Sequence, residues 1–172
     1  MEPRKNIGRM LEAYSLLRRM GGRDLQMVLV GPPGWGLRQI RRSLERSDIR
    51  PYVKWLGYVP DEDLAVLYKH AELFLYLSLY EGFGFPPLEA MAAGTCVVAA
   101  HRGSLPECLG DAAALVDPLD TNSIATTLHQ LIQKDDLRQE YVQKGYLQSR
   151  RFSWERSAGK TVELYRELVS QT

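Results

Sequence analysis

The sequence contains no apolar run of the length that a membrane span requires, and its first residues lack the apolar core of a signal peptide. There are only two cysteines, Cys96 and Cys108, which is unlike the cysteine framework of a small secreted protein. Charge of one sign is not in excess either, since 22 Lys and Arg face 21 Asp and Glu. With no net field to attract nucleic acid or a membrane surface, we expect a cytoplasmic protein that binds no nucleic acid.

Several catalytic motifs are absent as well. The stretch GPPGWG, residues 31–36, has no Lys where a P-loop needs one, and Gln39 occupies the third glycine position of a dinucleotide fingerprint. The three histidines, His70, His101 and His129, are far apart, and no Cys, His and Asp spacing indicates a metal site. No nucleophile motif of the G-x-S-x-G kind is present. Nucleotide hydrolysis and NAD-dependent chemistry are therefore disfavoured, and no metal or cofactor is expected.

What the sequence does contain is an alternation of short apolar strands and amphipathic helices. Its 172 residues suffice for one domain, residues 1–172, with a core of its own. Alternating strands and helices over residues 25–100 favour an α/β fold with a parallel sheet and helices on both faces, followed by C-terminal helices. Strands are predicted at 25–31, 52–57, 73–78, 95–100 and 113–117, and helices at 6–20, 37–44, 61–70, 86–93, 120–133, 135–149 and 153–170.

The sequence also predicts helix caps and the burial of individual strands. Asn6, Asp61 and Ser153 each stand where a helix N-cap is predicted. The stretch LQMVLVG, which begins at residue 25, is predicted to be a buried strand. The stretches LFLYLS, TCVVAA and AALVD, which begin at residues 73, 95 and 113, are continuous apolar strands of the kind that is covered on both faces.

The stretch YEGFGFPPLEAMAAG, residues 80–94, follows one of the predicted strands directly. Ligands of parallel sheets bind beyond the C-terminal ends of the strands. Pro86 and Pro87 suit the first turn of a helix, and Gly82 and Gly84 just before it allow close approach of the backbone to a ligand. The start of such a helix attracts anions, of which a diphosphate is a natural one.

Two carboxylates, Glu81 and Glu89, flank this turn with seven residues between them. Beside a diphosphate they would have to face hydroxyl groups, which points to a nucleotide-sugar with ribose near one glutamate and the sugar near the other. Arg4 and Lys5, just before the first helix, form a second candidate phosphate site. Taken on spacing alone, the alternative of a plain strand-to-helix turn with Glu89 on the surface is equally open.

Together these motifs resemble the C-terminal, donor-binding domain of the retaining glycosyltransferases of family 4, which have the GT-B architecture and a Rossmann-like sheet. Two glutamates separated by seven residues in the context EGFGFPPLEAMAAG are the signature of that family. The counterparts run in order along nearly the whole chain: EPRKN, LVGPPGWG, VKWLGYVPDEDLAVLY, LSLYEGFGFPPLEAMAAGT, GSLPECLGDAAALVDP and FSW.

The resemblance implies a role for individual residues. Arg4 and Lys5 would hold the donor diphosphate, Glu81 would lie by the donor sugar and support reaction at its anomeric carbon, and Glu89 would bind the ribose. Backbone contacts to sugar hydroxyls and phosphate would come from Gly82, Phe83 and Gly84, and the base would rest near Tyr58 and Val59. The two basic side chains and the helix end would supply the positive potential in place of a metal.

By the same resemblance, the reaction transfers a sugar from a nucleoside diphosphate with retention of configuration. The absence of an obvious nucleophile fits a front-face path in which the leaving phosphate takes the acceptor's proton. The motifs resemble those of mannosyltransferases that use GDP-mannose in polysaccharide assembly. We therefore expect mannose transfer to a glycan or lipid-linked acceptor, with the complete enzyme peripheral at the membrane.

The chain also departs from the family pattern. Relatives have an N-terminal acceptor domain and an apolar strand before the position of Pro3, and that strand normally lies between the strands at 25–31 and 73–78. We expect the sheet either to close this gap or to borrow a strand, since unpaired edges would be open to self-association. Cys96 replaces a frequent Pro, and His101 follows a strand end near the cleft. No transfer by this chain alone is expected.

Two other functions remain open at this point. One is a non-catalytic module, or one piece of a split enzyme, that binds a nucleotide-sugar without transferring it. The other is a GT-B-like enzyme of different chemistry, such as a sugar-nucleotide epimerase, which the context EGFGFPPLEAMA disfavours.

Overall fold

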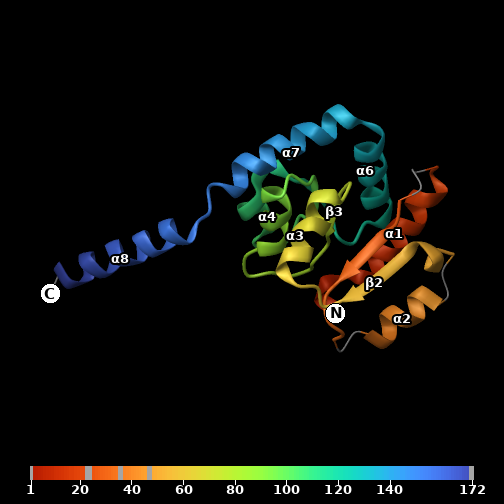
Figure 1. Ribbon diagram of the computed structural model, residues 1–172, viewed down its shortest axis with the longest axis horizontal. Coiled ribbons are helices and arrows are strands. Elements are labelled where there is room, and N and C mark those ends of the chain that lie inside the picture. The colour runs from red at the N-terminus through yellow and green to blue at the C-terminus, as the bar shows by residue number, and fades with distance from the viewer. Residues whose placement is uncertain (1, 22–24, 35–36, 46–47, 171–172) are drawn as a thin grey trace.

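The computed structural model describes residues 2–21, 25–34, 37–45 and 48–170. It has an α/β body and one long C-terminal helix that points away from it (Figure 1). The first part of the body comprises η1 (Pro3–Lys5), α1 (Ile7–Arg19), β1 (Met27–Val30), α2 (Leu37–Glu45), η2 (Arg50–Tyr52), β2 (Val53–Gly57) and α3 (Asp61–His70). The second part comprises β3 (Phe74–Tyr76), α4 (Phe85–Ala92), β4 (Val97–Ala100), α5 (Leu105–Leu109), η3 (Gly110–Ala112), β5 (Ala114–Val116), α6 (Thr121–Gln133) and α7 (Asp135–Ser149), and α8 (Trp154–Ser170) ends the described chain.

All strand pairs are parallel, as the sequence predicts, but the strands form two sheets. One has the order β1-β2, with Val28 opposite Lys54, and the other has the order β3-β4-β5, with Val98 opposite Ala114. Among the described residues no strand pairing joins β1 to β3, so the expectation that a continuous sheet would close the gap is wrong. Borrowing of a strand, and self-association through these edges, stay predictions.

A shared core holds the two sheets together. Side chains from α1 and α6, such as Leu11 and Ile124, pack in one cluster with Leu29 of β1 and Val98 of β4. Helix α1 therefore lies against both halves, and this fixes the position of η1, which precedes it, relative to the end of β3. That placement decides the geometry of the site.

Strand burial differs between the sheets. Every residue of β4 is buried, as expected of a central strand with helices on both sides. In β1 burial alternates, and Val28 and Val30 are exposed on one face (42% and 37%). The prediction of a buried strand is therefore wrong for Val28 and Val30, which lie outside the core cluster that contains Leu29.

The helix boundaries follow the sequence closely, whereas two of three predicted caps fail. The Ser153 hydroxyl accepts a hydrogen bond from the Arg156 amide and so caps α8, as predicted. Asn6 precedes α1 but has a left-handed backbone (φ 57°), and its side chain donates to the Pro118 carbonyl instead. Asp61 is the first residue of α3 rather than its cap.

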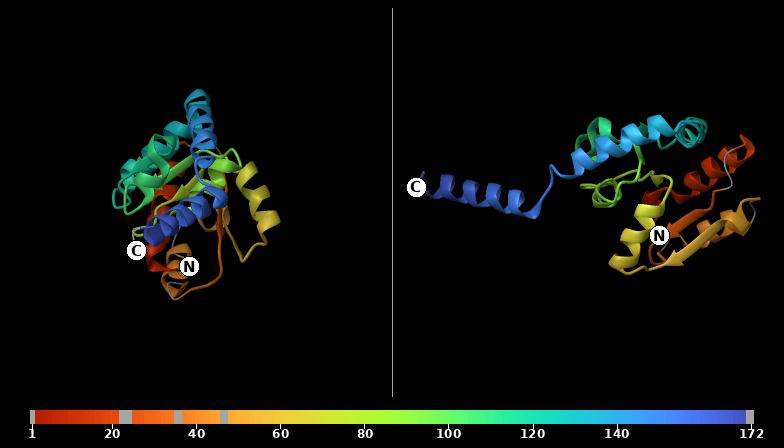
Figure 2. Two further views of the ribbon diagram at one scale, coloured as in Figure 1. Left: turned by 90° about the vertical axis from the view of Figure 1, so that its left-hand side faces the viewer. Right: turned by 45° about the horizontal axis from the view of Figure 1, so that its top comes forward.

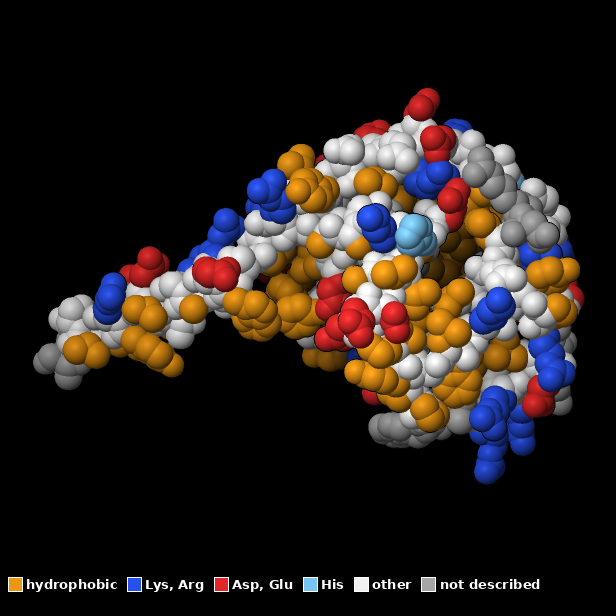
Figure 3. Space-filling model, in the orientation of Figure 1, with side chains coloured by type: hydrophobic (Ala, Val, Ile, Leu, Met, Phe, Trp, Pro, Cys, Tyr) orange, Lys and Arg blue, Asp and Glu red, His pale blue; other side chains and the backbone are white. Residues whose placement is uncertain are grey.

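Helix α8 leaves the body and is exposed along its whole length (Figure 2). Its exposed apolar residues, including Trp154 (77% exposed) and Tyr165 (63%), gather along the helix (Figure 3). At its start, Trp154 stacks on Phe85 of α4, with ring centroids 6.1 Å apart. Within the ranges that the structure describes, no helix is at once long enough and apolar enough to cross a membrane.

Candidate functional site

The segment η1 lies directly beside the chain that leaves β3. The amide of Leu79 donates to the Arg4 carbonyl at 2.8 Å, and the Ser78 hydroxyl oxygen lies 3.2 Å from the same carbonyl. Because of these bonds, the basic pair Arg4 and Lys5 lies at the C-terminal end of β3, next to Glu81. The two candidate sites that the sequence suggested separately are one site.

Glu81 is the centre of this site. Its Oε1 atom lies 2.6 Å from Lys5 Nζ, 2.8 Å from Arg4 Nη1, 2.7 Å from the Tyr76 hydroxyl and 2.6 Å from the Ser78 hydroxyl. The side chain is only 13% exposed, whereas those of Arg4 and Lys5 are 42% and 28% exposed. One carboxylate oxygen thus gathers two cations and two hydroxyls, and the cations keep a face open to solvent.

The charge of Glu81 follows from these partners. Burial on its own would raise the pKa of the carboxyl, but hydrogen bonds from Lys5, Ser78 and Tyr76 outweigh it and lower the pKa to about 2. Burial, followed by the hydrogen bond to Glu81, raises the pKa of Tyr76, so the phenol stays a proton donor. At neutral pH Glu81 is therefore a carboxylate and has no proton to give as a general acid.

Glu89 lies on the exposed side of α4, eight positions after Glu81 in the chain. Its Oε2 atom accepts a hydrogen bond of 3.2 Å from the hydroxyl of Tyr68, a buried residue in the last turn of α3. Burial, and then the charge of Glu89, raises the pKa of Tyr68, so this phenol also remains a donor. Glu89 is thus a hydrogen-bond acceptor for a neutral phenol.

The loop between the glutamates has a fixed backbone. Gly84 adopts φ 140°, and a Cβ there would lie 2.9 Å from Leu105 Cδ2, so the position requires glycine. The hydroxyl oxygen of Ser104 lies 2.9 Å from the Glu81 carbonyl and 2.6 Å from the Phe83 carbonyl, so it can donate to either of them. Pro86 and Pro87 open α4 as predicted. A tight loop and a helix start therefore lie immediately beside Glu81.

Not all predicted site residues meet at this place. Tyr58 (74% exposed) and Val59 follow β2, in the other sheet, and make no described contact with Glu81 or Glu89. Near them the ends of β1 and β2 are joined, since the Gly31 amide donates to the Gly57 carbonyl at 2.7 Å. In the stretch GPPGWG, Trp35 and Gly36 lie outside the described residues. His101 is exposed, and its amide pairs with Val116 rather than with the site.

Four residues that shape the site were not predicted from the sequence: Tyr68, Tyr76, Ser78 and Ser104. A signal existed for Tyr76 and Ser78, because they alternate with apolar residues at the end of a buried strand, where a polar group needs a partner. Tyr68 and Ser104 gave no such signal. Their partners come from segments more than 20 positions away.

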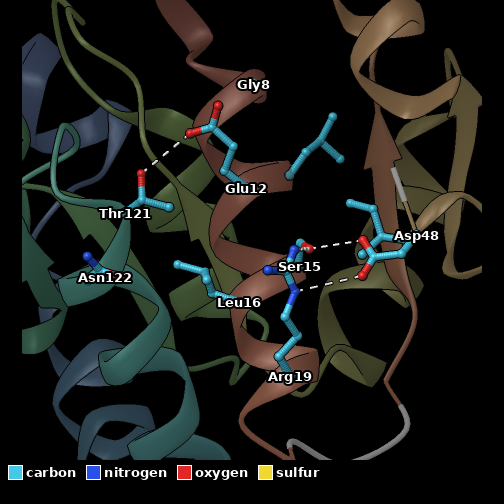
Figure 4. A pocket seen from close by; sticks show the side chains of 10 residues that line it. Gly8, Glu12, Ser15, Leu16, Arg19, Asp48, Thr121 and Asn122 are labelled. Carbon is cyan, nitrogen blue, oxygen red and sulfur yellow. Dashed lines mark hydrogen bonds and ion pairs between the residues drawn. The ribbon is translucent and has the colours of Figure 1, made fainter. Parts of the chain in front are cut away.

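A separate groove of about 780 Å³ is lined by α1, by Asp48 and Ile49 and by the first residues of α6 (Figure 4). Its polar side chains already pair across it: Ser15 donates to Asp48 at 3.0 Å, and Thr121 donates to Glu12 at 3.5 Å. The residues that line it include none of the predicted site residues. In the described ranges, no group of three His, Cys, Asp or Glu side chains gathers as metal ligands would, and metal independence stays a prediction.

The chain is similar to proteins of known activity. A family model described as "Glycosyl transferases group 1" matches residues 1–148. Over 168 residues the chain is 42% identical to the O-antigen chain mannosyltransferase B of Escherichia coli, covering 98% of the chain and 44% of that protein. It is 35% identical over 176 residues to the MMP alpha-(1->4)-mannosyltransferase of Mycolicibacterium hassiacum, covering 98% and 41%.

Solved structures share the fold. The sucrose-phosphate synthase of Thermosynechococcus elongatus superposes with a TM-score of 0.85 at 27% identity, covering 99% of the chain and 44% of that protein. The chain therefore spans less than half the length of each of these relatives.

Proposed function

The chain belongs to the group 1 glycosyl transferases, and we propose that it is the donor-binding part of a retaining family 4 enzyme that transfers mannose from GDP-mannose to a glycan or lipid-linked acceptor. Its α/β fold matches the C-terminal domains of GT-B glycosyltransferases. The observation that carries the proposal is the meeting of Arg4, Lys5 and Glu81 at the end of β3, beside the start of α4. The likeness to two mannosyltransferases supports the choice of sugar.

In this proposal, Arg4 and Lys5 bind the diphosphate. Both cations are partly exposed and lie in front of a carboxylate that is nearly buried. A diphosphate carries more charge than a carboxylate and offers Arg a planar pair of acceptors, so it competes for both cations. The loop of Gly82, Phe83 and Gly84 and the first residue of α4 would add backbone amides, whereas Pro86 and Pro87 have none to donate.

Glu89 is the proposed acceptor for the ribose hydroxyls. It is exposed, and among the described residues Tyr68 donates to one of its two oxygens. A carboxylate with a free oxygen can accept two hydroxyl donors at once. The base would then extend toward Tyr58 and Val59, where exposed side chains follow β2.

The proposed chemistry exchanges one bond for another at the anomeric carbon. The bond from that carbon to the diphosphate breaks, the acceptor oxygen bonds to the same carbon, and the departing phosphate takes the acceptor's proton. Lys5 and Arg4 stabilise the charge that develops on the leaving diphosphate, which is the main catalytic contribution. Glu81 serves as a fixed negative charge and hydroxyl acceptor near the sugar, because its low pKa excludes a role as a proton donor.

The acceptor site is proposed to lie in the part of the relatives that this chain does not span. On that basis the chain alone does not transfer sugar, needs no metal, and acts in the cytoplasm, with any membrane association supplied by the complete enzyme. Turnover of GDP-mannose with an acceptor by the pure chain would refute the claim of inactivity.

Calorimetric titration tests the donor. GDP-mannose, UDP-glucose and ADP-glucose are titrated separately into the chain, into Glu89→Ala and into Glu163→Ala, a control on the exposed helix α8. The proposal expects GDP-mannose to bind best, Glu89→Ala to lose binding, and Glu163→Ala to keep it. Preference for another base would refute the choice of donor, and equal binding by Glu89→Ala would refute the ribose role.

A further inference from the structure

Each of the two glutamates of the site has a buried tyrosine as its partner. Tyr76, in β3, donates to Glu81 Oε1 at 2.7 Å, and Tyr68, in α3, donates to Glu89 Oε2 at 3.2 Å. Both tyrosines are only 8% exposed, so their hydroxyls are not surface groups that happen to touch a carboxylate. The two tyrosines come from different elements, and each reaches a different glutamate.

Phe74 joins these two pairs. Its ring meets Tyr68 edge to face, with centroids 5.2 Å apart at 88°, and stacks on Tyr76 at 5.9 Å and 24°. Both arrangements are favourable for aromatic rings, and packing of this kind leaves little freedom of rotation. Tyr68, Phe74 and Tyr76, here called the aromatic row, thus form a continuous packed connection from Glu89 to Glu81.

We propose that the aromatic row positions both glutamates: Tyr76 holds Glu81, Tyr68 holds Glu89, and Phe74 fixes the distance between them. The inference deepens the proposed function, on which it rests, by naming the groups that keep the sugar-facing and ribose-facing carboxylates in place. These tyrosines act through the glutamates and are positioning residues.

The need for Tyr76 follows from the competition for Lys5. In the free site, Lys5 lies 2.6 Å from the Tyr76 hydroxyl and 2.6 Å from Glu81, and Arg4 also pairs with Glu81. A bound diphosphate attracts both cations away from the carboxylate. The neutral donors Tyr76 and Ser78 are not drawn to the diphosphate. They therefore keep Glu81 hydrogen-bonded and charged after Arg4 and Lys5 have moved to the ligand.

Tyr68 is proposed to fix the conformation of the Glu89 side chain. Glu89 is exposed on α4, where a glutamate side chain samples several rotamers and loses this freedom on binding. The bond from Tyr68 selects one of them in advance. Tyr68 is itself held, because the Thr95 hydroxyl donates to its carbonyl and its ring packs on Phe74. The ribose therefore meets a carboxylate already in place.

Carboxyl-detected NMR of the ligand-free chain tests the positioning of Glu81 without any sugar nucleotide. The groups that face this carboxyl are Arg4, Lys5, Tyr76 and Ser78. Tyr76→Phe is expected to raise the pKa of Glu81 by about one unit, because a donor to the charged form is lost. Tyr68→Phe and the exposed control Tyr165→Phe leave it unchanged. An unchanged titration of Glu81 in Tyr76→Phe would overturn the role of Tyr76.

The same spectra test the row as a unit. The carboxyl resonance of Glu89 is expected to move in Tyr68→Phe but not in Tyr76→Phe, whereas Phe74→Leu moves the resonances of both glutamates. A response of only one glutamate to Phe74→Leu would overturn the connection. If a variant does not fold, the unmodified chain still tests the bond between Tyr76 and Glu81. The chemical shift of Tyr76 Cζ is expected to change with pH together with that of the Glu81 carboxyl. A Tyr76 Cζ shift that does not change over this pH range would contradict the proposal.

Ligand binding tests the positioning of Glu89. Calorimetry compares GDP with inorganic pyrophosphate, which lacks the ribose. Tyr68→Phe is expected to weaken GDP roughly fivefold, the effect of one lost hydrogen bond, and to leave pyrophosphate unchanged. Equal weakening of both ligands, or of neither, would overturn the role of Tyr68. If the unmodified chain bound no GDP, the proposed function would fail, while the titration of Glu81 would still decide the role of Tyr76.

Discussion

Lys5 Nζ and Glu81 Oε1 lie 2.6 Å apart, although 76 positions separate the two residues in the chain. The pair brings the start of α1 to the end of β3. It also means that the cation proposed to bind the diphosphate already has an anionic partner in the free protein. Several expected outcomes follow from that competition and from the fold that creates it.

Removing the anionic partner is expected to strengthen the binding of a simple diphosphate. In Glu81→Gln, Arg4 and Lys5 lose their shared carboxylate and are free for the ligand, so pyrophosphate and GDP bind about three- to tenfold more tightly. The gain is smaller for GDP-mannose, because the amide no longer offers the sugar a charged acceptor. Calorimetry of the three ligands measures both effects, and weaker pyrophosphate binding in this variant would contradict the competition.

Removing the cation has the opposite effect. Lys5→Ala is expected to weaken GDP binding by at least about tenfold, since a charge-assisted contact to phosphate is lost. Lys160→Ala, in the exposed helix α8, is the matched control and leaves the affinity unchanged. A Lys5→Ala chain that bound GDP like the unmodified one would show that the diphosphate lies elsewhere.

Acid is expected to destabilise the fold through Glu81. The pKa of this carboxyl is lowered in the folded chain, to about 2 from an ordinary value of 4.5. A lowered pKa means stability that is present above pH 4.5 and lost as the pH falls toward 2, amounting to roughly 2–3 kcal/mol. Urea unfolding between pH 7 and pH 2.5 measures it. Glu81→Gln should flatten this part of the pH dependence, and an equally steep loss in the variant would contradict the assignment.

The loop before α4 is expected to tolerate no side chain at Gly84. Gly84→Ala combines a strained φ of 140° with a contact of 2.9 Å to Leu105, and should cost about 2–4 kcal/mol in the free energy of unfolding. Gly159→Ala, within the exposed helix α8, meets no atom within 4 Å and should stabilise that helix by about 0.5–1 kcal/mol. Thermal denaturation of both variants gives the comparison. An unaffected Gly84→Ala would mean that the loop readily rearranges.

The sequence predicted the local elements well, because their signals are local. Pro86 and Pro87 marked the start of α4, Gly94 its end, and the apolar run at β4 its complete burial. Caps were harder, since a cap depends on where the side chain finds its partner. Asn6 illustrates this: its amide donates to Pro118, a residue 112 positions away, instead of closing its own helix.

Much of the candidate site could also be inferred from residue types and spacing. Glu81, Glu89, Arg4 and Lys5 were named from the sequence, and the structure brings three of them into direct contact. The tyrosines behind the glutamates could not be found in that way, because Tyr68 reaches Glu89 only through the packing of α3 against α4. The division of the strands into two sheets could not be predicted from the sequence either, since strand pairing is a property of the whole fold.

The most direct test of the central claim follows Lys5 itself. The chain, labelled at lysine Nζ and at glutamate Cδ, is titrated with GDP-mannose and observed by NMR. The account predicts that the ammonium resonance of Lys5 and the carboxyl resonance of Glu81 move together with the diphosphate phosphorus signals, because the cation exchanges one partner for the other. Binding of GDP-mannose with no change at Lys5 or Glu81 would contradict it.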